Sequence, residues 1–534
     1  MGFYLHALGI CTYMGIAPKG AEGLRALRRW ISWHRRKGVS FFYLYAAFDT
    51  EALKRELAWE IDSGLLLLLQ VNGGNDEQKL LSAYRDSLQR ARYVCKHVAF
   101  LKMGEYLQVA GQRLLPEILA DQFSASCAAI YMQNDLGIRC IASPLAVSSF
   151  ETETNLITYG NGNLVAKPAE GIDVSRKLPP RRIALLSHVM ARNGAPLALL
   201  SVAGILREAG YEVDVFSVES GALEGEFRAL GAGVIIAPEM HTTPLADQPW
   251  YPYYDLVFVN TAVLARCFDK PLQGAPAIWW LHESPSSLEW CGVDKELLAN
   301  IHEERVTTFG VSPLAQKAFL ALRPDWHIAG NLVLGVRDSY APGQERRKNS
   351  GRFVFMMIGA IEKNKGQDIF LQAIAALPED IRRKGEFWMV GSEGKGTEED
   401  YCREIREMAD RYTEVQMIDF QPHEKILEMY GKVDVLVVPS REECLPTVAI
   451  EAMMMGVPCI MADSVGVAHY VKDGENAMLF ASGDSGGLAG AMRQMITEHV
   501  KLVPMQKACR DLYESEFTIG VFRNRLLDLV DGCM

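Results

Sequence analysis

The 534-residue sequence lacks several features that mark specialised classes of protein. No apolar run reaches the roughly 20 residues of a membrane-spanning helix, and residues 65–69 are long enough only for a buried strand. No positive charge precedes Lys19, so a signal peptide is not expected. The eleven cysteines are scattered and form no CxxC pair, which indicates a reducing cytoplasm and no structural zinc.

Positive charge is also scarce. With 55 Lys and Arg against 66 Asp and Glu, the net charge is −11, which argues against general nucleic-acid binding because that needs a basic face. The hydrophobic content of 49% and charged content of 23% are those of an ordinary soluble globular protein. The length exceeds what one core supports and predicts about three domains.

A dinucleotide-binding fingerprint is missing as well. Residues 183–186 are predicted as a strand and residues 195–209 as a helix, which together open a βαβ unit. The loop between them, SHVMARNGAP, does not contain GxGxxG, so a dinucleotide-dependent oxidoreductase is disfavoured. The alternation of strand-like and helix-like segments elsewhere still indicates the α/β class.

The most informative stretch is residues 434–460, DVLVVPSREECLPTVAIEAMMMGVPCI. Residues 435–438 form a continuous apolar run that is typical of a parallel strand buried on both faces. After a polar loop, Pro446 is suited to the first position of a helix, and Gly456 ends that helix. A second strand is predicted at residues 458–461.

Two glutamates border this arrangement. Glu443 falls in the loop before the helix and Glu451 about two turns inside it, so both can face a crevice at the carboxyl end of a strand. The amides of Leu445 and Thr447 offer an anion site there, and Glu451 could accept hydrogen bonds from ribose hydroxyls. Without further context, an exposed loop glutamate and a helix-face glutamate would be the plainer interpretation.

The spacing supplies that context. Glu443 and Glu451, with seven residues between them in PSREECLPTVAIEAMMMGVPCI, resemble the signature of retaining glycosyltransferase family 4. The resemblance implies the GT-B fold, a first glutamate that contacts the donor sugar and a second that binds the nucleotide ribose. Cys444, Leu445 and Pro446 replace the glycines that usually follow the first glutamate.

The same resemblance implies further site residues. His282, in WWLHES, matches the family's histidine beside the donor sugar, and Gly194 matches a glycine that lets a loop approach the diphosphate. In GAIEKNKGQD, Gly359 and Lys365 match donor-binding positions, with Lys365 as the diphosphate clamp. Ala360 replaces the family's arginine. A structural histidine, a plain turn glycine and a solvated lysine are the alternatives.

These landmarks divide the C-terminal two-thirds of the chain into two Rossmann-like lobes. Residues 182–340 are expected to form the acceptor lobe, and residues 351–534 the nucleotide-sugar lobe with a C-terminal helix that crosses back. A polar join at residues 342–350 separates them, and a linker at residues 169–181 precedes them. The family resemblance implies that the loop at residues 420–422 lines the base pocket.

Residues 1–168 also read as α/β. The order ALRRWISWHRRKGVSFFYLY, QKLLSAYRDSLQRARY and HVAFLKMGEYL resembles the GT-A domain of glycosyltransferases of family 92 type. Those enzymes carry acidic motifs where this chain has Gly15-Ile16, Ala46-Ala47 and, at residues 102–105, KMGE. A divalent ion on a diphosphate needs carboxylate oxygens, so we expect a degenerate GT-A-like domain without metal that docks a partner or second subunit. The change Glu105→Ala is then expected to be nearly silent.

A helix predicted at residues 22–37 is amphipathic and strongly basic. Its basic side chains are Arg25, Arg28, Arg29, Arg35, Arg36 and Lys37. A helix packed on its own sheet with a solvated basic face is favoured, and a peripheral membrane-surface helix is the alternative.

The sequence thus predicts a cytoplasmic, metal-independent glycosyltransferase of hexosyltransferase type that needs no cofactor beyond its nucleotide diphosphate sugar. The acceptor would be a glycan or a lipid-linked molecule, in surface polysaccharide synthesis, with peripheral contact at the inner membrane surface as an extension. The expected catalytic residues are His282, Glu443 and Lys365. The expected donor-binding residues are Gly194, Gly359, Lys365, Glu443, Leu445, Pro446, Thr447 and Glu451. A bifunctional enzyme with an active N-terminal GT-A domain, or a non-catalytic sugar-nucleotide-binding interaction protein, remains an alternative.

Overall fold

The computed structural model describes residues 5–92, 94–109, 113–123, 127–134, 137–144, 147–150, 156–158, 165–170, 172–175, 180–340, 351–393, 399–498 and 502–534. The chain forms two compact units. The N-terminal unit contains residues 1–181 and the short segment 249–255, and the C-terminal unit contains residues 182–248 and 256–534. The polar join predicted at residues 342–350 lies outside the described residues.

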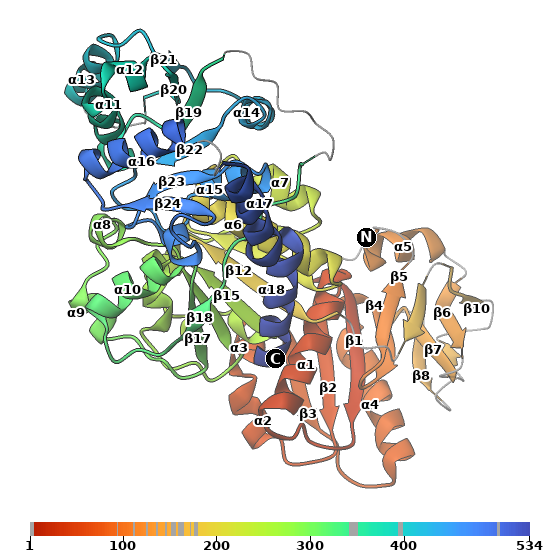
Figure 1. Cartoon of the computed structure of the whole chain (residues 1–534). Coiled ribbons are helices and arrows are strands. Elements are labelled where there is room, and N and C mark those ends of the chain that lie inside the picture. The colour runs from red at the N-terminus through yellow and green to blue at the C-terminus, as the bar shows by residue number, and fades with distance from the viewer. Residues whose placement is uncertain are drawn as a thin grey trace. The chain divides into compact units, whose positions relative to one another are not determined.

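The N-terminal unit is built on a mixed seven-stranded sheet in the order β10-β6-β7-β4-β1-β2-β3 (Figure 1). Strands β4, β1, β2 and β3 are parallel, and β7 is antiparallel to both β4 and β6. Its strands are β1 (His6–Met14), β2 (Phe41–Ala46), β3 (Leu66–Gln70), β4 (Cys95–Lys102), β5 (Tyr106–Val109), β6 (Cys127–Asn134), β7 (Gly137–Ala142), β8 (Val147–Phe150), β9 (Leu156–Thr158), β10 (Val165–Pro168) and β11 (Ile172–Ser175). Its α-helices are α1 (Gly20–Arg36), α2 (Glu51–Glu56), α3 (Ala58–Asp62), α4 (Asp76–Ala91) and α5 (Leu115–Gln122).

The segment predicted as a linker, residues 169–181, is partly structured and lies in the N-terminal unit. Within it, β11 pairs antiparallel with β5, in register from Ile172 opposite Val109 to Ser175 opposite Tyr106. The prediction of a plain linker is therefore wrong for residues 172–175. The pairing partner lies more than sixty residues upstream, so local composition carried no sign of it.

Helix α1 packs its apolar face on its own unit. Leu27, Trp30 and Ile31 are buried, and the Trp30 indole donates a hydrogen bond of 2.7 Å to the Glu105 carbonyl. Two of its arginines form ion pairs inside the same unit. Arg28 lies 2.9 Å from Glu60, which is 1% exposed, and Arg29 pairs with Asp255 in the segment 249–255. The favoured prediction of a packed helix is confirmed, and part of its basic face stabilises the fold.

The C-terminal unit contains two wholly parallel sheets. The first lobe has the strand order β14-β13-β12-β15-β16-β17-β18, and the second has β21-β20-β19-β22-β23-β24. The strands of the first lobe are β12 (Arg182–Ser187), β13 (Glu212–Ser217), β14 (Gly233–Ile236), β15 (Leu256–Asn260), β16 (Ala277–Leu281), β17 (Val306–Gly310) and β18 (Ile328–Asn331). Its helices are α6 (Gly194–Glu208), α7 (Glu224–Ala229), α8 (Pro285–Trp290), α9 (Lys295–Ala299) and α10 (Pro313–Leu322), with 3₁₀ turns η1 (Pro238–His241), η2 (Leu245–Asp247) and η4 (Ala262–Phe268).

The second lobe repeats this architecture. Its strands are β19 (Phe353–Ile358), β20 (Gly385–Val390), β21 (Val415–Ile418), β22 (Val435–Val438), β23 (Cys459–Ala462) and β24 (Ala477–Phe480). Its helices are α11 (Gln367–Ala376), α12 (Glu379–Arg382), α13 (Glu399–Ala409), α14 (His423–Tyr430), α15 (Thr447–Met454), α16 (Ser485–Thr497) and α17 (Leu502–Leu512), with the turns η5 (Lys363–Lys365) and η6 (Gly466–Tyr470). Helices α11, α13 and α16 contribute to one core, and α14 and α15 contribute to the core on the other face of the sheet.

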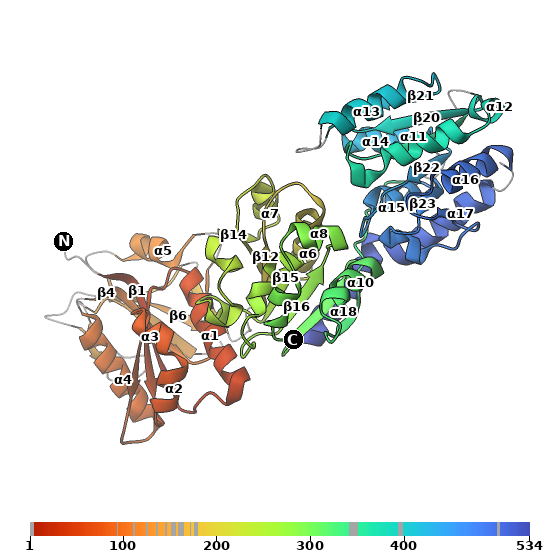
Figure 2. The same ribbon diagram turned by 90° about the vertical axis from the view of Figure 1, so that its left-hand side faces the viewer.

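The C-terminal helix α18 (Ile519–Cys533) crosses back to the first lobe, as the sequence predicted. Its residues Phe522, Leu526 and Val530 are completely buried in the core of that lobe. Helix α18, in dark blue, contacts α6 of the first lobe (Figure 1, Figure 2). None of the described helices is long and apolar enough to cross a membrane.

Several boundaries differ from prediction. Pro446 is the N-cap of α15 rather than its first residue, and Glu451 lies little more than one turn into the helix rather than two. The sheet of the first lobe ends with β18, which pairs parallel with β17. These shifts leave each predicted side chain on the element where it was expected.

Candidate active site

Each parallel sheet of the C-terminal unit reverses its strand order at one point. The reversal lies between β12 and β15 in the first lobe and between β19 and β22 in the second. Open α/β sheets bind ligands outside the carboxyl ends of their strands at such a switch point. Gly359 and Lys365 follow β19, and Glu443 follows β22, so the predicted donor residues stand at the switch point of the second lobe.

The structure brings Lys365 and Glu443 together. The Lys365 Nζ lies 2.7 Å from Glu443 Oε1, and the Ser440 hydroxyl donates to Glu443 Oε2 at 2.9 Å. The side chains of Lys365 and Glu443 are 25% and 21% exposed. The pair is therefore half-buried, and a ligand in solution can reach both charges.

The two loops that carry this pair are fastened to each other. The Asn364 amide donates to the Glu442 carbonyl at 2.7 Å, and the Glu442 backbone N–H donates to Asn364 Oδ1 at 3.1 Å. Arg441 makes a two-pronged pair with Asp368, at 3.0 and 2.7 Å. Such bidentate pairs fix orientation as well as adding energy. These contacts between the two loops fix the position of Lys365 relative to Glu443.

Glycines make this close approach feasible. Gly366 has φ of 78°, and a Cβ there would lie 2.2 Å from the Pro439 carbonyl oxygen at the end of β22. A side chain at residue 366 would therefore push the two loops apart. Gly359 lets the Lys365 side chain lie across the backbone, where an added Cβ would sit 3.4 Å from the Lys365 Cδ.

Glu451 is the more buried of the two predicted carboxylates, with a side chain that is 12% exposed. His423, the first residue of α14, places its Nε2 3.0 Å from Glu451 Oε1. Burial raises the pKa of Glu451, and the nearby His423 acts in the opposite direction. Because Pro446 caps the helix without a side-chain hydrogen bond, no described residue accepts from the Leu445 or Thr447 amides.

His282 lies at the carboxyl end of β16, in the first lobe. Burial lowers the pKa of His282 to about 3, with a further lowering from His188. Its ring stands edge to face against Trp280, with 4.3 Å between ring centroids, and its Nε2 is buried without a partner among the described residues. A neutral imidazole with one open nitrogen suits a hydrogen bond to an uncharged ligand such as a sugar hydroxyl.

The loop after β16 is tied to the second lobe. The backbone N–H and hydroxyl of Ser286 both donate to Glu442 Oε2, at 3.1 and 2.6 Å. Glu283 instead serves the fold, because its carboxylate accepts the N–H groups of Ala262 and His282, each at 2.9 Å. The Ser286 contact places the loop that follows His282 next to the loop that carries Glu443.

Gly194, predicted to let a loop approach the ligand, is the first residue of α6. A Cβ built there would meet nothing within 4 Å. No packing within this chain therefore requires glycine at residue 194, and its part in ligand approach stays a prediction.

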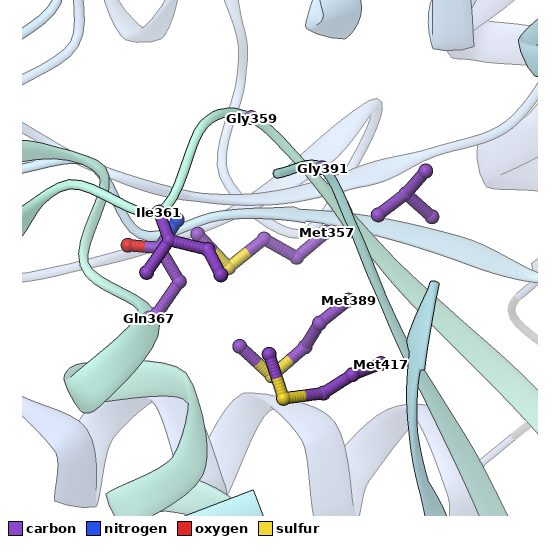
Figure 3. Close-up of a pocket in the computed structure, with 8 residues that line it drawn as sticks. Met357, Gly359, Ile361, Gln367, Met389, Gly391 and Met417 are labelled. Carbon is purple, nitrogen blue, oxygen red and sulfur yellow. The ribbon is translucent and has the colours of Figure 1, made fainter. Parts of the chain in front are cut away.

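A small pocket lies at the carboxyl ends of β19, β20 and β21 (Figure 3). Met357, Met389 and Met417 line it with Gly359 and Gly391, and it has about 220 Å³ of empty space, including its opening to solvent. Ligand pockets usually measure about 300 to 1,000 Å³. The pocket is thus smaller than a nucleotide site and lies on the α11 side of the sheet, whereas Glu451 lies on the α15 side.

In the N-terminal unit, Glu105 has a structural role. Arg139 donates to both of its carboxylate oxygens at 2.6 Å, and the Lys102 backbone N–H donates to Oε2 at 2.8 Å. The Glu105 and Arg139 side chains are 0% and 5% exposed. The expectation that Glu105→Ala is nearly silent does not extend to stability, because the change would remove both hydrogen bonds from the buried Arg139 to Glu105.

Sequence reasoning identified the charged residues of the site but missed those that hold them. Ser440, Asn364 and Ser286 carry no signature of their own, and His423 could be found only as the residue after the loop predicted to line the base pocket. Among the described residues, no three His, Cys, Asp or Glu side chains are grouped as a metal ion would require.

Comparison with protein families matches two segments of the chain. Residues 180–289 match the family described as Glycosyl-transferase family 4, and residues 343–512 match Glycosyl transferases group 1. A glycogen synthase of Mycobacterium tuberculosis is 26% identical over 183 residues, which are 34% of this chain and 43% of the relative. A D-inositol 3-phosphate glycosyltransferase of Corynebacterium diphtheriae is 29% identical over 171 residues, 30% of this chain and 40% of the relative. The chain thus spans less than half the length of these curated relatives.

Solved structures show the same fold. The Anabaena protein HepE in complex with UDP covers 66% of this chain and all of its own, with a TM-score of 0.53 and 19% identity. The sucrose-phosphate synthase of Thermosynechococcus elongatus covers 66% of this chain and 98% of its own, with a TM-score of 0.52 and 19% identity. The two parallel sheets and these neighbours confirm the predicted α/β class and GT-B fold. The resemblance of residues 1–168 to a GT-A domain stays a prediction.

Proposed function

Because two segments of the C-terminal unit match glycosyltransferase families, we propose that this chain is a retaining glycosyltransferase of hexosyltransferase type. It would move a sugar from a nucleotide diphosphate sugar to a glycan or lipid-linked acceptor. The observation that carries the proposal is the Lys365–Glu443 pair, 2.7 Å apart at the switch point of the second lobe. That place supplies a cation for a diphosphate and a carboxylate for sugar hydroxyls.

Stabilisation of the leaving diphosphate is the main catalytic task. Lys365 and the open amides of Leu445 and Thr447 would face the negative charge that develops as the bond to the sugar breaks. Preorganised donors of this kind usually supply the largest share of rate enhancement. They would also make a metal ion unnecessary, since the chain itself provides the compensating positive charge.

The sugar would be held from both lobes. His282 stays neutral at ordinary pH because burial lowers its pKa to about 3, so it would bind a hydroxyl by hydrogen bonding. Glu443 would accept hydrogen bonds from the sugar once Lys365 turns to the diphosphate. The acceptor oxygen would then bond to the anomeric carbon on the face from which the diphosphate departs, which retains the anomeric configuration.

The nucleoside would lie on the α15 side of the second lobe, with its ribose on Glu451. The predicted base loop, residues 420–422, directly precedes His423, which touches Glu451, so base and ribose sites would adjoin. Phe420 is 71% exposed in that loop and offers a flat apolar face to a base. The methionine-lined pocket on the other face of the sheet has no part in this arrangement.

A non-catalytic sugar-nucleotide-binding protein is the second candidate. It is favoured by Ala360, which stands where the family resemblance expects a second cationic side chain for the diphosphate. The test is to incubate the purified full-length protein with UDP-, ADP- and GDP-sugars and to measure release of the nucleoside diphosphate, with and without simple glycoside acceptors. Release supports the enzyme. Binding of a nucleotide sugar without any release supports the second candidate, and no binding contradicts both.

For the N-terminal unit we propose a docking role rather than catalysis. Its Glu105 forms a buried ion pair with Arg139 and is not accessible to a ligand. The positions where the GT-A resemblance expects further carboxylates hold Gly15, Ala46 and Lys102. A role in surface polysaccharide synthesis, with contact to the inner membrane surface, extends this proposal. Flotation of the protein with anionic vesicles tests the membrane contact, and protein recovered only at the bottom of the gradient contradicts it.

A further inference from the structure

Glu451 shares one carboxylate oxygen with a histidine that the proposed donor clamp does not use. The His423 Nε2 lies 3.0 Å from Glu451 Oε1. The His423 side chain is 65% exposed, whereas that of Glu451 is 12% exposed. An exposed imidazole thus covers one side of a mostly buried carboxylate.

Helix α14 controls the surroundings of this carboxylate. Burial raises the pKa of Glu451, and the influences in the opposite direction come from His423 and Tyr430, at the two ends of α14. The Tyr430 hydroxyl donates to the Val448 carbonyl at 2.9 Å, and Cys459, whose thiol donates to the Ala449 carbonyl, also raises the pKa of Tyr430. Helix α15, with the sequence TVAIEAMM, carries no charged residue besides Glu451. His423 and Tyr430, both on α14, are therefore the described side chains that oppose the effect of burial on the pKa of Glu451.

We propose that His423 is a positioning residue for the donor, which holds Oε1 of Glu451 and leaves Oε2 to accept hydrogen bonds from the ribose of a nucleoside diphosphate sugar. This inference rests on the proposed function, which assigns the ribose to Glu451. Partners that orient a ligand-binding group often matter nearly as much as the group itself. His423 does not touch the reacting atoms, so its effect falls on donor binding and not on turnover.

The contact also ties donor affinity to pH. Protonation of Glu451 turns one of its oxygens into a hydrogen-bond donor and so reduces the number of hydrogen bonds that the carboxyl group can accept. Burial raises the pKa of Glu451, and His423 lowers it. Removal of His423 should therefore raise the pKa of Glu451, because burial then acts with less opposition. Without His423, donor affinity should therefore decline at a higher pH as the solution is made more acidic.

The experiment measures the dissociation constant of UDP by calorimetry from about pH 5 to pH 8, with ADP and GDP in parallel, and continues with whichever nucleotide binds the wild type. His423→Ala should weaken binding roughly fivefold to tenfold near pH 7, because Oε1 of Glu451 would lose the hydrogen bond that orients it. It should also move the acidic decline of affinity to higher pH. His423→Gln keeps an N–H donor but no charge, so it should restore most of the affinity near pH 7 and leave the decline shifted.

Two controls test whether His423 acts through the ribose hydroxyls. For the 2′,3′-dideoxy form of the nucleotide, which lacks the hydroxyls that Glu451 would bind, wild type and His423→Ala should have equal affinity. His302→Gln alters a half-exposed histidine that lies 3.7 Å from Glu304 in the first lobe, and it should leave the pH profile of the wild type unchanged. Equal melting temperatures of the variants show that each is folded.

The outcomes separate the two proposals. If no nucleoside diphosphate binds the wild type, the proposed function fails. If a nucleotide binds but His423→Gln follows the wild type at every pH, the inference about His423 is overturned while the function stands. The inference is also overturned if His423→Ala weakens binding of the dideoxy nucleotide as much as binding of the ribonucleotide. His423 would then not act through the contact between Glu451 and the ribose hydroxyls.

Discussion

The N-terminal unit and the second lobe each place a glutamate after a parallel strand at the reversal of strand order, and they use it differently. Glu105 follows β4, which lies beside β1, and Glu443 follows β22, which lies beside β19. The Glu105–Arg139 side chains are 0% and 5% exposed, whereas the Glu443–Lys365 side chains are 21% and 25% exposed. The same kind of ion pair at the same topological position is structural in one case and accessible in the other.

Solvation explains the contrast. Separating a fully buried ion pair leaves a charge without water or partner, which costs about 3–5 kcal/mol. A half-exposed pair gains little beyond about 1 kcal/mol from its contact, so a ligand can open it and take over both charges. Burial, rather than the presence of a carboxylate, therefore distinguishes a ligand site from a structural pair at a strand end.

The largest expected effect is on the buried pair. Glu105→Ala should destabilise the N-terminal unit by about 3–5 kcal/mol, because the buried Arg139 guanidinium would lose both of its hydrogen bonds to Glu105. Hydrogen exchange of the β1 and β4 amides should report the loss, while nucleotide affinity should stay unchanged. The double variant Glu105→Leu with Arg139→Met replaces both partners by apolar groups and should recover most of the stability. If Glu105→Ala were as stable as the wild type, the Glu105–Arg139 pair would not be structural, and the contrast with the Glu443–Lys365 pair would not hold.

Next in size is the accessible pair. Lys365→Ala should lower kcat by about 10² to 10³, as loss of an electrostatic partner in the transition state does. Nucleoside diphosphate release under donor saturation measures this, and an unchanged melting temperature shows that the half-exposed pair is dispensable for folding. Lys363→Ala, which removes an exposed lysine two residues earlier, is the matched control and should keep the wild-type rate. Equal losses in both variants would argue for general charge rather than a specific clamp.

A smaller effect is expected at the ribose carboxylate. Glu451→Ala should weaken donor binding by about 1.5 to 3 kcal/mol, through loss of charge-assisted hydrogen bonds, and should change kcat little. Calorimetry with the nucleotide that binds the wild type gives the affinity. The affinity of Glu451→Gln should lie between those of the wild type and Glu451→Ala. If Glu451→Ala lowered kcat at an unchanged affinity, the carboxylate would belong to the reaction rather than to donor recognition.

No effect is expected from removing metal ions. Excess chelator should leave the transfer rate unchanged, because Lys365 and backbone amides would neutralise the diphosphate. Introducing Lys102→Asp and Gly104→Asp together should not create a second activity in the N-terminal unit. A rate that falls with chelator and returns with a divalent ion would mean that the N-terminal unit, or a site elsewhere, binds a catalytic metal.

Sequence predicted best where a strand is buried on both faces. Residues 435–438 form a continuous apolar run, and β22 occupies these residues. The GT-B fold and the assignment of Glu443 and Lys365 to one donor site followed from the family resemblance, whereas their ion pair is known only from the structure. The depth of Glu451 in α15 was overestimated, because Glu451 is the fifth residue of the helix and would be only the sixth if Pro446 were the first, so neither start places it two turns inside.

What the sequence did not reveal depends on contacts between distant residues. Arg139 reaches Glu105 from 34 positions away, and His423 reaches Glu451 from 28 positions away. Strand β11 was read as linker because its partner, β5, lies far upstream. An isolated arginine or histidine belongs to no periodic sequence pattern, so the sequence does not indicate its partner and only the folded structure does.

The location of the donor site in the second lobe is tested most directly by nucleotide-dependent thermal stability. One of UDP, ADP or GDP, at about 100 times its dissociation constant, should stabilise the wild type by about 2.7 kcal/mol. The double variant Lys365→Ala with Glu451→Ala should lose nearly all of this stabilisation at the same nucleotide concentration. Full stabilisation of the double variant, or no stabilisation of the wild type by any of the three, would contradict the assignment.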